Sequence, residues 1–213
     1  MKKSVILTAL VTMILWSCAQ PLTPDDAARM RDEITAQYWR KDRPEGYYSD
    51  RLFAEVLDKC DRLIERDTCL RSLRDDYDLK SRILLSMGRT HEAFAEVENY
   101  AARLPEGHPW RTAISGYGCT LRGDIQAATG YYVKAAAECD RNDFGMSDYE
   151  RLLLKAEMHL RAGDRNNAQR AIDELKAAYP AGEYARLDGL TLENLGIYCT
   201  WLDQYRTAGS INL

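Results

Sequence analysis

The chain has 213 residues, of which 46% are apolar and 29% are charged, within the range of soluble globular domains. This composition excludes a polytopic membrane protein, a collagen-like chain and a fully disordered chain. The 29 basic and 33 acidic residues give a formal net charge of −4, and no block of like charge stands out. Nucleic-acid-binding domains normally carry a basic patch, so we expect no nucleic-acid partner.

Residues 1–17 have the pattern of an export signal. Lys2 and Lys3 form a short basic start, and a stretch without charge runs from Val5 to Trp16. Spanning a bilayer takes about 20 apolar residues, so this shorter stretch fits a signal peptide better than a membrane helix. We therefore expect these residues to be absent from the folded protein.

The signal ends at residues 15–18 in Leu-Trp-Ser-Cys, which resembles the lipobox of bacterial lipoproteins. The resemblance implies that Cys18 is lipid-modified and becomes the mature N-terminus, with residues 18–22 as a short tether. Lipoproteins kept in the inner membrane often carry Asp after this cysteine. Here Ala19 follows, so the resemblance favours the outer membrane, with the protein facing the periplasm. The alternative is an ordinary signal peptide or an N-terminal anchor.

Five cysteines remain once Cys18 is assigned to lipid, and an odd number cannot all pair within the chain. Their spacing is irregular, so we expect free thiols that behave as small apolar side chains, with a local Cys60–Cys69 disulfide as the alternative. The histidines lack metal-ligand spacing to the cysteines, so no metal site is expected. The five are Cys60, Cys69, Cys119, Cys139 and Cys199.

The strongest pattern in the chain is a repeat centred on a glycine. Gly88, Gly123 and Gly163 lie 35 and 40 residues apart, and each is followed by an alanine after five residues. A small residue precedes each glycine by seven positions, and a proline follows two of them by 17. The accompanying positions are Ala93, Ala128, Ala168, Ser81, Gly116, Ala156, Pro105, Pro180 and, as the aromatic residue of the middle copy, Tyr132.

This unit of about 34 residues resembles the tetratricopeptide repeat, a helical hairpin. Its glycine would end the first helix in a left-handed conformation, its alanine would allow two helices to cross closely, and its proline would stop the second helix. No alternating strand pattern appears, so we expect an all-α fold. The resemblance implies a right-handed superhelical solenoid of such hairpins, closed by a C-terminal capping helix.

The repeats follow a helical pair at residues 23–66, either a degenerate repeat or an N-terminal cap. Thr23 and Pro24 predict the start of a helix over 24–41, and the apolar spacing after residue 48 predicts a second helix over 49–65. A capping box at Ser147 opens the third copy. The repeat region, 67–213, divides into copies at 67–105, 109–140, 147–180 and, in part, 187–213.

A partial fourth copy lies near the end of the sequence. Leu192, Leu195 and Gly196 match the L-x-x-L-G pattern of a first helix in the family, and the chain stops at Leu213 before a second helix could be completed. We therefore expect residues 187–205 to form a terminal helix that covers the last hairpin.

No motif for catalysis or for cofactor binding is complete. His91 and Glu92 begin a metalloprotease helix motif, but position 95 is alanine instead of the second histidine. Gly116 and Gly118 begin a dinucleotide-binding loop, but the third glycine is misplaced and no strand precedes them. We expect no enzyme activity, no cofactor and no small-molecule substrate.

In tetratricopeptide repeats the first helix of each hairpin lines a concave groove that binds partners. By the family's pattern, the groove side chains here are a mixture of apolar and charged residues, which suits a peptide or another helix. Packing between repeats is the alternative, above all for Leu85, Leu121 and Leu160. The predicted groove residues are Arg82, Tyr117, Thr120, Glu157, Arg161, Ile197 and Trp201.

These features together predict a lipid-anchored, periplasm-facing scaffold that binds another envelope protein or a peptide. Residues 178–185 resemble a junction in envelope repeat proteins, so the first alternative is an accessory lipoprotein of outer-membrane barrel assembly or cell-wall coordination. The second alternative is the sensory input module of a split or truncated signalling protein.

Overall fold

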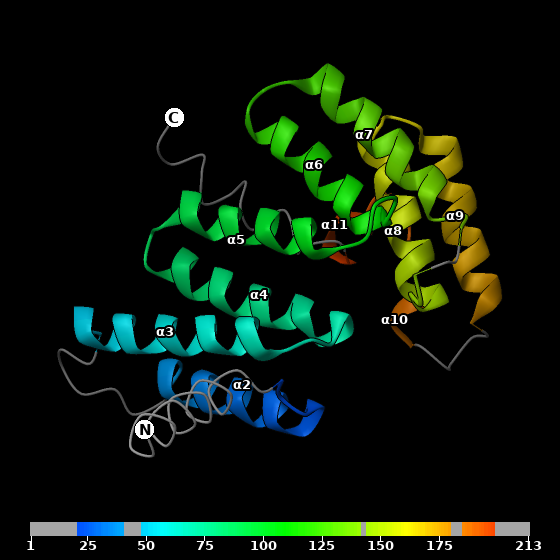
Figure 1. Ribbon diagram of the computed structural model, residues 1–213. Coiled ribbons are helices and arrows are strands. Elements are labelled where there is room, and N and C mark those ends of the chain that lie inside the picture. Colours follow the sequence, from blue (N-terminus) through cyan, green and yellow to red (C-terminus); the bar gives the residue numbers. More distant parts are fainter. Residues whose placement is uncertain (1–20, 41–47, 142–143, 180–184, 199–213) are drawn as a thin grey trace, which may run out of the picture. The chain divides into compact units, whose positions relative to one another are not determined.

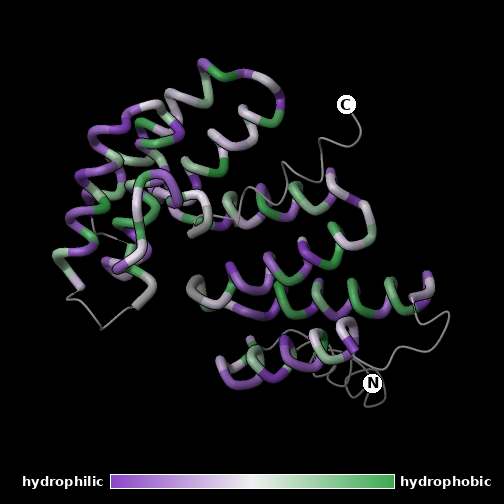
Figure 2. The backbone as a smooth tube through the Cα atoms, turned by 180° about the vertical axis from the view of Figure 1, so that it is seen from behind, coloured by the Kyte–Doolittle hydropathy of each residue, from purple (hydrophilic) through white to green (hydrophobic). Residues whose placement is uncertain are grey.

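The computed structural model describes residues 21–40, 48–141, 144–179 and 185–198. Over these ranges the chain is all-α, as the sequence predicts, with eight helices of 13 to 17 residues, two of four residues, and no strand. Each of the longer helices carries both hydrophobic and hydrophilic residues along its length (Figure 2). None of the helices described is long and apolar enough to cross a bilayer.

The chain divides into two compact units, residues 1–96 and 97–213, with the boundary inside helix α5. In the N-terminal unit α2 (Pro24–Tyr38), α3 (Asp50–Arg66) and α4 (Leu70–Ser86) pack against one another (Figure 1). Thr23 is the N-cap of α2, because its hydroxyl accepts a hydrogen bond from the Asp26 N–H at 3.2 Å. The buried core of these helices is formed by Ala27, Ile34, Tyr38, Leu52, Val56, Cys60, Leu63, Leu79 and Ile83.

Helical hairpins make up most of the remaining described chain, up to residue 178. A Ser147–Glu150 capping box starts the last full hairpin, because each residue's side chain accepts the backbone N–H of the other. Within the C-terminal unit α6 lies beside α7, and α8 lies beside α9 (Figure 1). The bounds are α5 (Thr90–Arg103), α6 (Pro109–Leu121), α7 (Ile125–Glu138), α8 (Asp148–Arg161) and α9 (Arg165–Ala178).

The same turn joins the two helices of each hairpin. Gly88, Gly123 and Gly163 have φ angles of +73°, +79° and +82°, the left-handed region that a residue without Cβ adopts most readily. The residue after each glycine donates its N–H to a carbonyl five residues back, which ends the first helix in a Schellman motif. These bonds run from Arg89 to Leu84, from Asp124 to Cys119 and from Asp164 to His159, at 2.9, 2.9 and 2.8 Å.

The second helix of two hairpins starts at once after this turn. Asp124 accepts the N–H of Ala127 at 3.0 Å, and Asp164 accepts the N–H of Asn167 at 3.1 Å, so each aspartate is an N-cap. In the remaining hairpin Arg89 occupies this position. One helix therefore ends and the next begins within two residues, which requires the helices to lie antiparallel and adjacent.

Small buried residues allow the helices of each hairpin to approach closely. The three repeat alanines, Ala93, Ala128 and Ala168, are all buried, as are Ser81 and Ala156 on the first helices. The Ser81 hydroxyl donates to the carbonyl of Ala93 at 3.0 Å. At Gly116 an added Cβ would lie only 2.8 Å from the ring of Tyr132, so this crossing has no room for a side chain.

The helix expected over 187–205 differs from the described structure. Helix α10 (Ala185–Asp188) ends before Gly189, and α11 (Leu195–Tyr198) begins after a turn, so the prediction of one continuous helix is wrong. The Thr191 N–H bonds to Asn194 Oδ1 at 2.7 Å, and the Asn194 N–H bonds to Thr191 Oγ1 at 3.4 Å. This reciprocal pair is the signature of a new helix start. Residues 199–205 lie outside the described residues.

The leucines of this segment nevertheless pack on the last full hairpin. Leu187, Leu190 and Leu195 are buried together with Leu152 of α8 and Ile172 of α9. Gly196 lies in α11. Pro105 follows the end of α5 by two residues, whereas Pro180 lies outside the described residues.

No disulfide joins the four described cysteines, so the alternative of a Cys60–Cys69 bridge is wrong. Cys60 faces the core between α2, α3 and α4, whereas Cys69 lies exposed at the start of α4, so the two side chains lie in different environments. Cys119 and Cys139 are buried, and Cys199 lies outside the described residues.

Two helical glycines provide a matched test of the close crossing. We expect Gly116→Ala to cost about 1–3 kcal/mol, because the Tyr132 ring is buried and its hydroxyl is bonded to Thr120. Gly130→Ala should instead stabilise α7 by about 0.5–1 kcal/mol, since nothing lies within 4 Å of its added Cβ. Urea unfolding followed by circular dichroism measures both changes. Equal midpoints for the two variants would contradict the close crossing.

Candidate functional site

The groove residues predicted from the sequence lie on the first helices of the hairpins. Arg82 lies on α4 in the N-terminal unit. In the C-terminal unit two of the predicted residues lie on α6 and two lie on α8. The side chain of Ile197 and all of Trp201 lie outside the described residues. The four that the C-terminal unit contains are Tyr117, Thr120, Glu157 and Arg161.

Three of these four residues form one cluster between α6 and α8. The guanidinium of Arg161 lies 5.4 Å from the centroid of the Tyr117 ring, within cation–π range, and its Nε lies 2.8 Å from Glu157 Oε1. Tyr117 is 0% exposed, and 17% of the Arg161 side chain is exposed. The cluster therefore joins the first helices of consecutive hairpins, and Arg161 is its most exposed member.

Thr120 contributes to packing within its own hairpin. Its hydroxyl lies 2.7 Å from the hydroxyl of Tyr132 on α7 and donates to the carbonyl of Gly116 at 3.2 Å. Both hydrogen bonds hold α6 against α7 at the crossing where Gly116 lies. The side chain is thus committed to the fold and has little hydrogen-bonding capacity left for a partner.

A corresponding contact occurs in the N-terminal unit. The guanidinium of Arg82 lies 5.8 Å from the Trp39 ring centroid, next to the end of α2, and its Nε lies 3.1 Å from Asp78 Oδ2. Tyr38 and Ser86 are hydrogen-bonded through their hydroxyls at the same end of α2 and α4. The Arg82 side chain is 55% exposed, which makes it the most accessible of the predicted groove residues whose side chains are described.

Two lysines that sequence reasoning missed hold successive helices together. Lys80 on α4 lies 2.6 Å from Asp61 of α3 and 2.7 Å from Glu96 of α5. Its charge is thus shared between the preceding helix and the following one. Burial by itself lowers the pKa of this ammonium group, but the two carboxylates outweigh burial and raise it.

The second lysine repeats this arrangement in the C-terminal unit. Lys155 on α8 lies 2.8 Å from Asp140, just after α7, and 3.4 Å from Glu174 on α9. Burial opposes the charged form here too, and the carboxylates again raise the pKa of the lysine. Lys80 and Lys155 each precede the turn glycine of their copy by eight residues, and this shared spacing is the signal that could have identified them.

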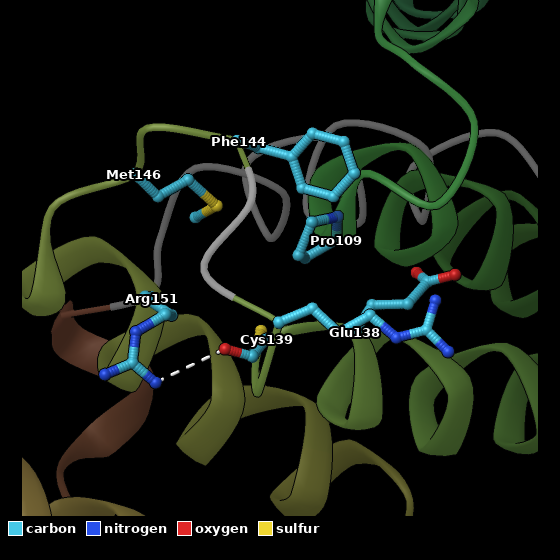
Figure 3. A pocket seen from close by; sticks show the side chains of 7 residues that line it. Pro109, Glu138, Cys139, Phe144, Met146 and Arg151 are labelled. Atoms are coloured by element: carbon cyan, nitrogen blue, oxygen red, sulfur yellow. Dashed lines mark hydrogen bonds between the residues drawn. The ribbon is translucent and has the colours of Figure 1, made fainter.

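A shallow hollow of about 180 Å³ lies in the C-terminal unit beside the end of α7 (Figure 3). Pro109, Phe144 and Met146 supply apolar walls, and Arg151 donates from Nη1 to the carbonyl of Cys139 at 3.3 Å. Burial raises the pKa of the Cys139 thiol to about 12, so this cysteine is protonated at neutral pH and is a poor nucleophile. The hollow contains none of the predicted groove residues.

Among the residues that the structure describes, no group of three or more His, Cys, Asp or Glu side chains could hold a metal ion. The predicted groove residues therefore fall into two separate groups, Arg82 with its neighbours in the N-terminal unit and the Arg161 cluster in the C-terminal unit.

No protein-family model matches this chain, and comparisons with curated proteins and with solved structures also found no match.

The Glu157–Arg161 pair can be tested by its effect on stability. Arg161→Gln leaves the buried Glu157 carboxylate without its guanidinium, so we expect a loss of about 1–3 kcal/mol in the free energy of unfolding. Adding Glu157→Gln should recover part of this loss, because the uncompensated charge disappears. Urea unfolding at pH 7 measures the cycle.

The matched control is Arg165→Gln, at an exposed arginine just after the same turn. Its effect should stay within about 0.5 kcal/mol. If Arg161→Gln destabilises no more than this control, the cluster does not hold α6 to α8.

Proposed function

We propose that this protein is a lipid-anchored scaffold of tetratricopeptide type that binds another envelope protein or a peptide and performs no catalysis. The observation that carries the proposal is the repeated hairpin turn. Three left-handed glycines, 35 and 40 residues apart, end three first helices with the same pair of backbone hydrogen bonds. Each is followed five residues later by a buried alanine at the helix crossing. Hairpins of this kind stack into a solenoid with a concave binding surface.

The accessible part of the candidate surface suits a polypeptide partner. On α4 the half-exposed Arg82 and the partly buried Leu85 lie within one turn of each other, and on α8 the partly buried Leu160 lies beside Arg161. These two first helices, α4 and α8, thus each carry an aliphatic side chain near a guanidinium. A helix or extended peptide with apolar residues and at least one carboxylate complements this pairing.

The proposed anchor rests on the sequence, because Cys18 lies outside the described residues. The lipobox-like tetrapeptide at 15–18 follows an apolar stretch of signal-peptide length. Lipid on Cys18 would hold the folded helices near a membrane while leaving their binding surface in the periplasm. Two or more acyl chains are needed for stable anchoring, and bacterial lipoprotein processing supplies them.

The anchor is tested by Cys18→Ala in the full chain. We expect loss of incorporated radiolabelled palmitate and a shift of the protein out of the outer-membrane fraction, because no other residue would carry lipid. Cys69→Ala, at an exposed cysteine within the fold, is the control and should keep both properties. Unchanged palmitate labelling of the Cys18 variant would overturn the anchor.

The binding surface is tested by site-specific photo-crosslinking in intact cells. A photoreactive phenylalanine analogue at Leu85 or Leu160 should trap a discrete protein or peptide adduct, because both positions border the candidate surface. The same analogue at Glu55 of α3 or Arg170 of α9, exposed positions on second helices, serves as the control. Adducts at the controls and none at Leu85 or Leu160 would place binding elsewhere.

A further inference from the structure

Three elements of the N-terminal unit bring two buried carboxyl groups and one guanidinium together. Asp76 on α4 is 0% exposed, and Asp67, which follows the last residue of α3, is 2% exposed. Arg31 on α2 places its Nε 3.3 Å from Asp76 Oδ1. Two acids thus face one base inside the protein, where an uncompensated charge is costly.

The two carboxyl groups have opposite hydrogen-bonding environments. Asp67 accepts the N–H of Cys69 at 2.8 Å on one oxygen and the hydroxyl of Ser72 at 2.6 Å on the other. Burial alone would raise the pKa of Asp67, but these donors outweigh it and leave the pKa below its ordinary value. Asp67 is therefore the carboxylate that remains ionised.

Asp76 receives no such support. Within the described part of the chain, neither of its buried oxygens accepts a hydrogen bond, and its one cation, Arg31, also interacts with Asp67. Burial and the neighbouring Asp67 raise the pKa of Asp76 to about 8, against the opposing effect of Arg31. A buried carboxyl group without donors is satisfied when it is protonated, because it then supplies its own O–H donor.

We propose that Asp67 and Asp76 share one proton at neutral pH, held on Asp76, and that losing it at alkaline pH loosens the packing of α2 on α3 and α4. With the proton present, the cluster contains one carboxylate and one guanidinium and is neutral. Without it, two carboxylates share Arg31. The other titratable groups around Asp76 are Asp75 on its own helix and the buried thiol of Cys60 on α3.

The direction of the pH dependence follows from the raised pKa. The folded chain keeps a proton on Asp76 that the unfolded chain releases above its ordinary pKa of 3.8. This stabilisation is complete below pH 3.8 and is lost as the pH rises through about 8. One proton is involved, so the unfolding equilibrium constant should rise about tenfold between pH 6 and 7 from this group, about fivefold between pH 7 and 8, and then level off.

Urea unfolding of the full chain between pH 6 and 8.5, with amide hydrogen exchange in α2, tests the proposal. Asp76→Asn should remove the alkaline rise in the unfolding constant and protect the α2 amides equally across the range, after correction for intrinsic exchange rates. Asp75→Asn, at an exposed neighbour, should keep the wild-type dependence. An Asp76→Asn variant with the wild-type pH dependence would overturn the shared proton.

A direct titration keeps the proposal testable if Asp76→Asn does not fold. In wild-type chain with ¹³C-labelled aspartate carboxyls, one resonance should titrate near pH 8 by NMR, and Asp67→Asn should move that titration to lower pH because the competing carboxylate is gone. If every aspartate resonance titrates below pH 6, the proton is not held and the proposal fails.

Discussion

The turn that joins the helices of each hairpin is the constraint on which the other packing depends. A left-handed glycine ends one helix, and at two of the three turns the next residue, an aspartate, caps the following helix. Because so few residues connect the two helices, the helices must pack against each other close to the turn. That crossing explains the alanines five residues after each glycine and the serine, glycine and alanine seven residues before. The short turn fixes the distance between the two helices, so a larger side chain at these positions would clash with the facing helix.

Contacts between hairpins build on this geometry with charge. Lys80 and Lys155 occupy the same position of their copies. Lys80 pairs with Asp61 of the preceding helix α3 and with Glu96 of α5, and Lys155 pairs with Asp140, just after the preceding helix α7, and with Glu174 of α9. A long, flexible lysine side chain can reach its carboxylate partners even when the spacing of the helices differs slightly between copies, whereas close apolar packing does not tolerate such differences. The middle copy has Ser115 at this position, and its hydroxyl donates to Arg111 on the same helix. The lysine linkage is therefore used in alternate hairpins of the described chain.

The sequence predicts what is periodic and local. Helix-ending glycines, N-caps and buried alanines follow from backbone chemistry at fixed offsets, so the hairpins could be delimited from residue spacing. What the sequence did not predict depends on neighbours distant in the chain or on competition between weak signals. The L-x-x-L-G match at Leu192 favoured a continuous helix, but the Thr191–Asn194 pair begins a new helix instead. By contrast, the helical spacing of apolar residues in 49–65 did place Cys60 on the apolar face of its helix, and it is buried there.

The predicted groove residues show how the size of a side chain decides whether a position on a first helix serves packing. A position on a first helix that faces the next hairpin contacts either a partner or the neighbouring first helix, and the size of the side chain decides which. The buried Tyr117 ring lies 5.4 Å from the Arg161 guanidinium, and the Trp39 ring lies 5.8 Å from that of Arg82. The Arg161 side chain is mostly buried, whereas more than half of the Arg82 side chain is exposed. Stacking of this kind restricts the arginine side chain to few conformations, so the contact that joins the helices also fixes where the positive charge lies.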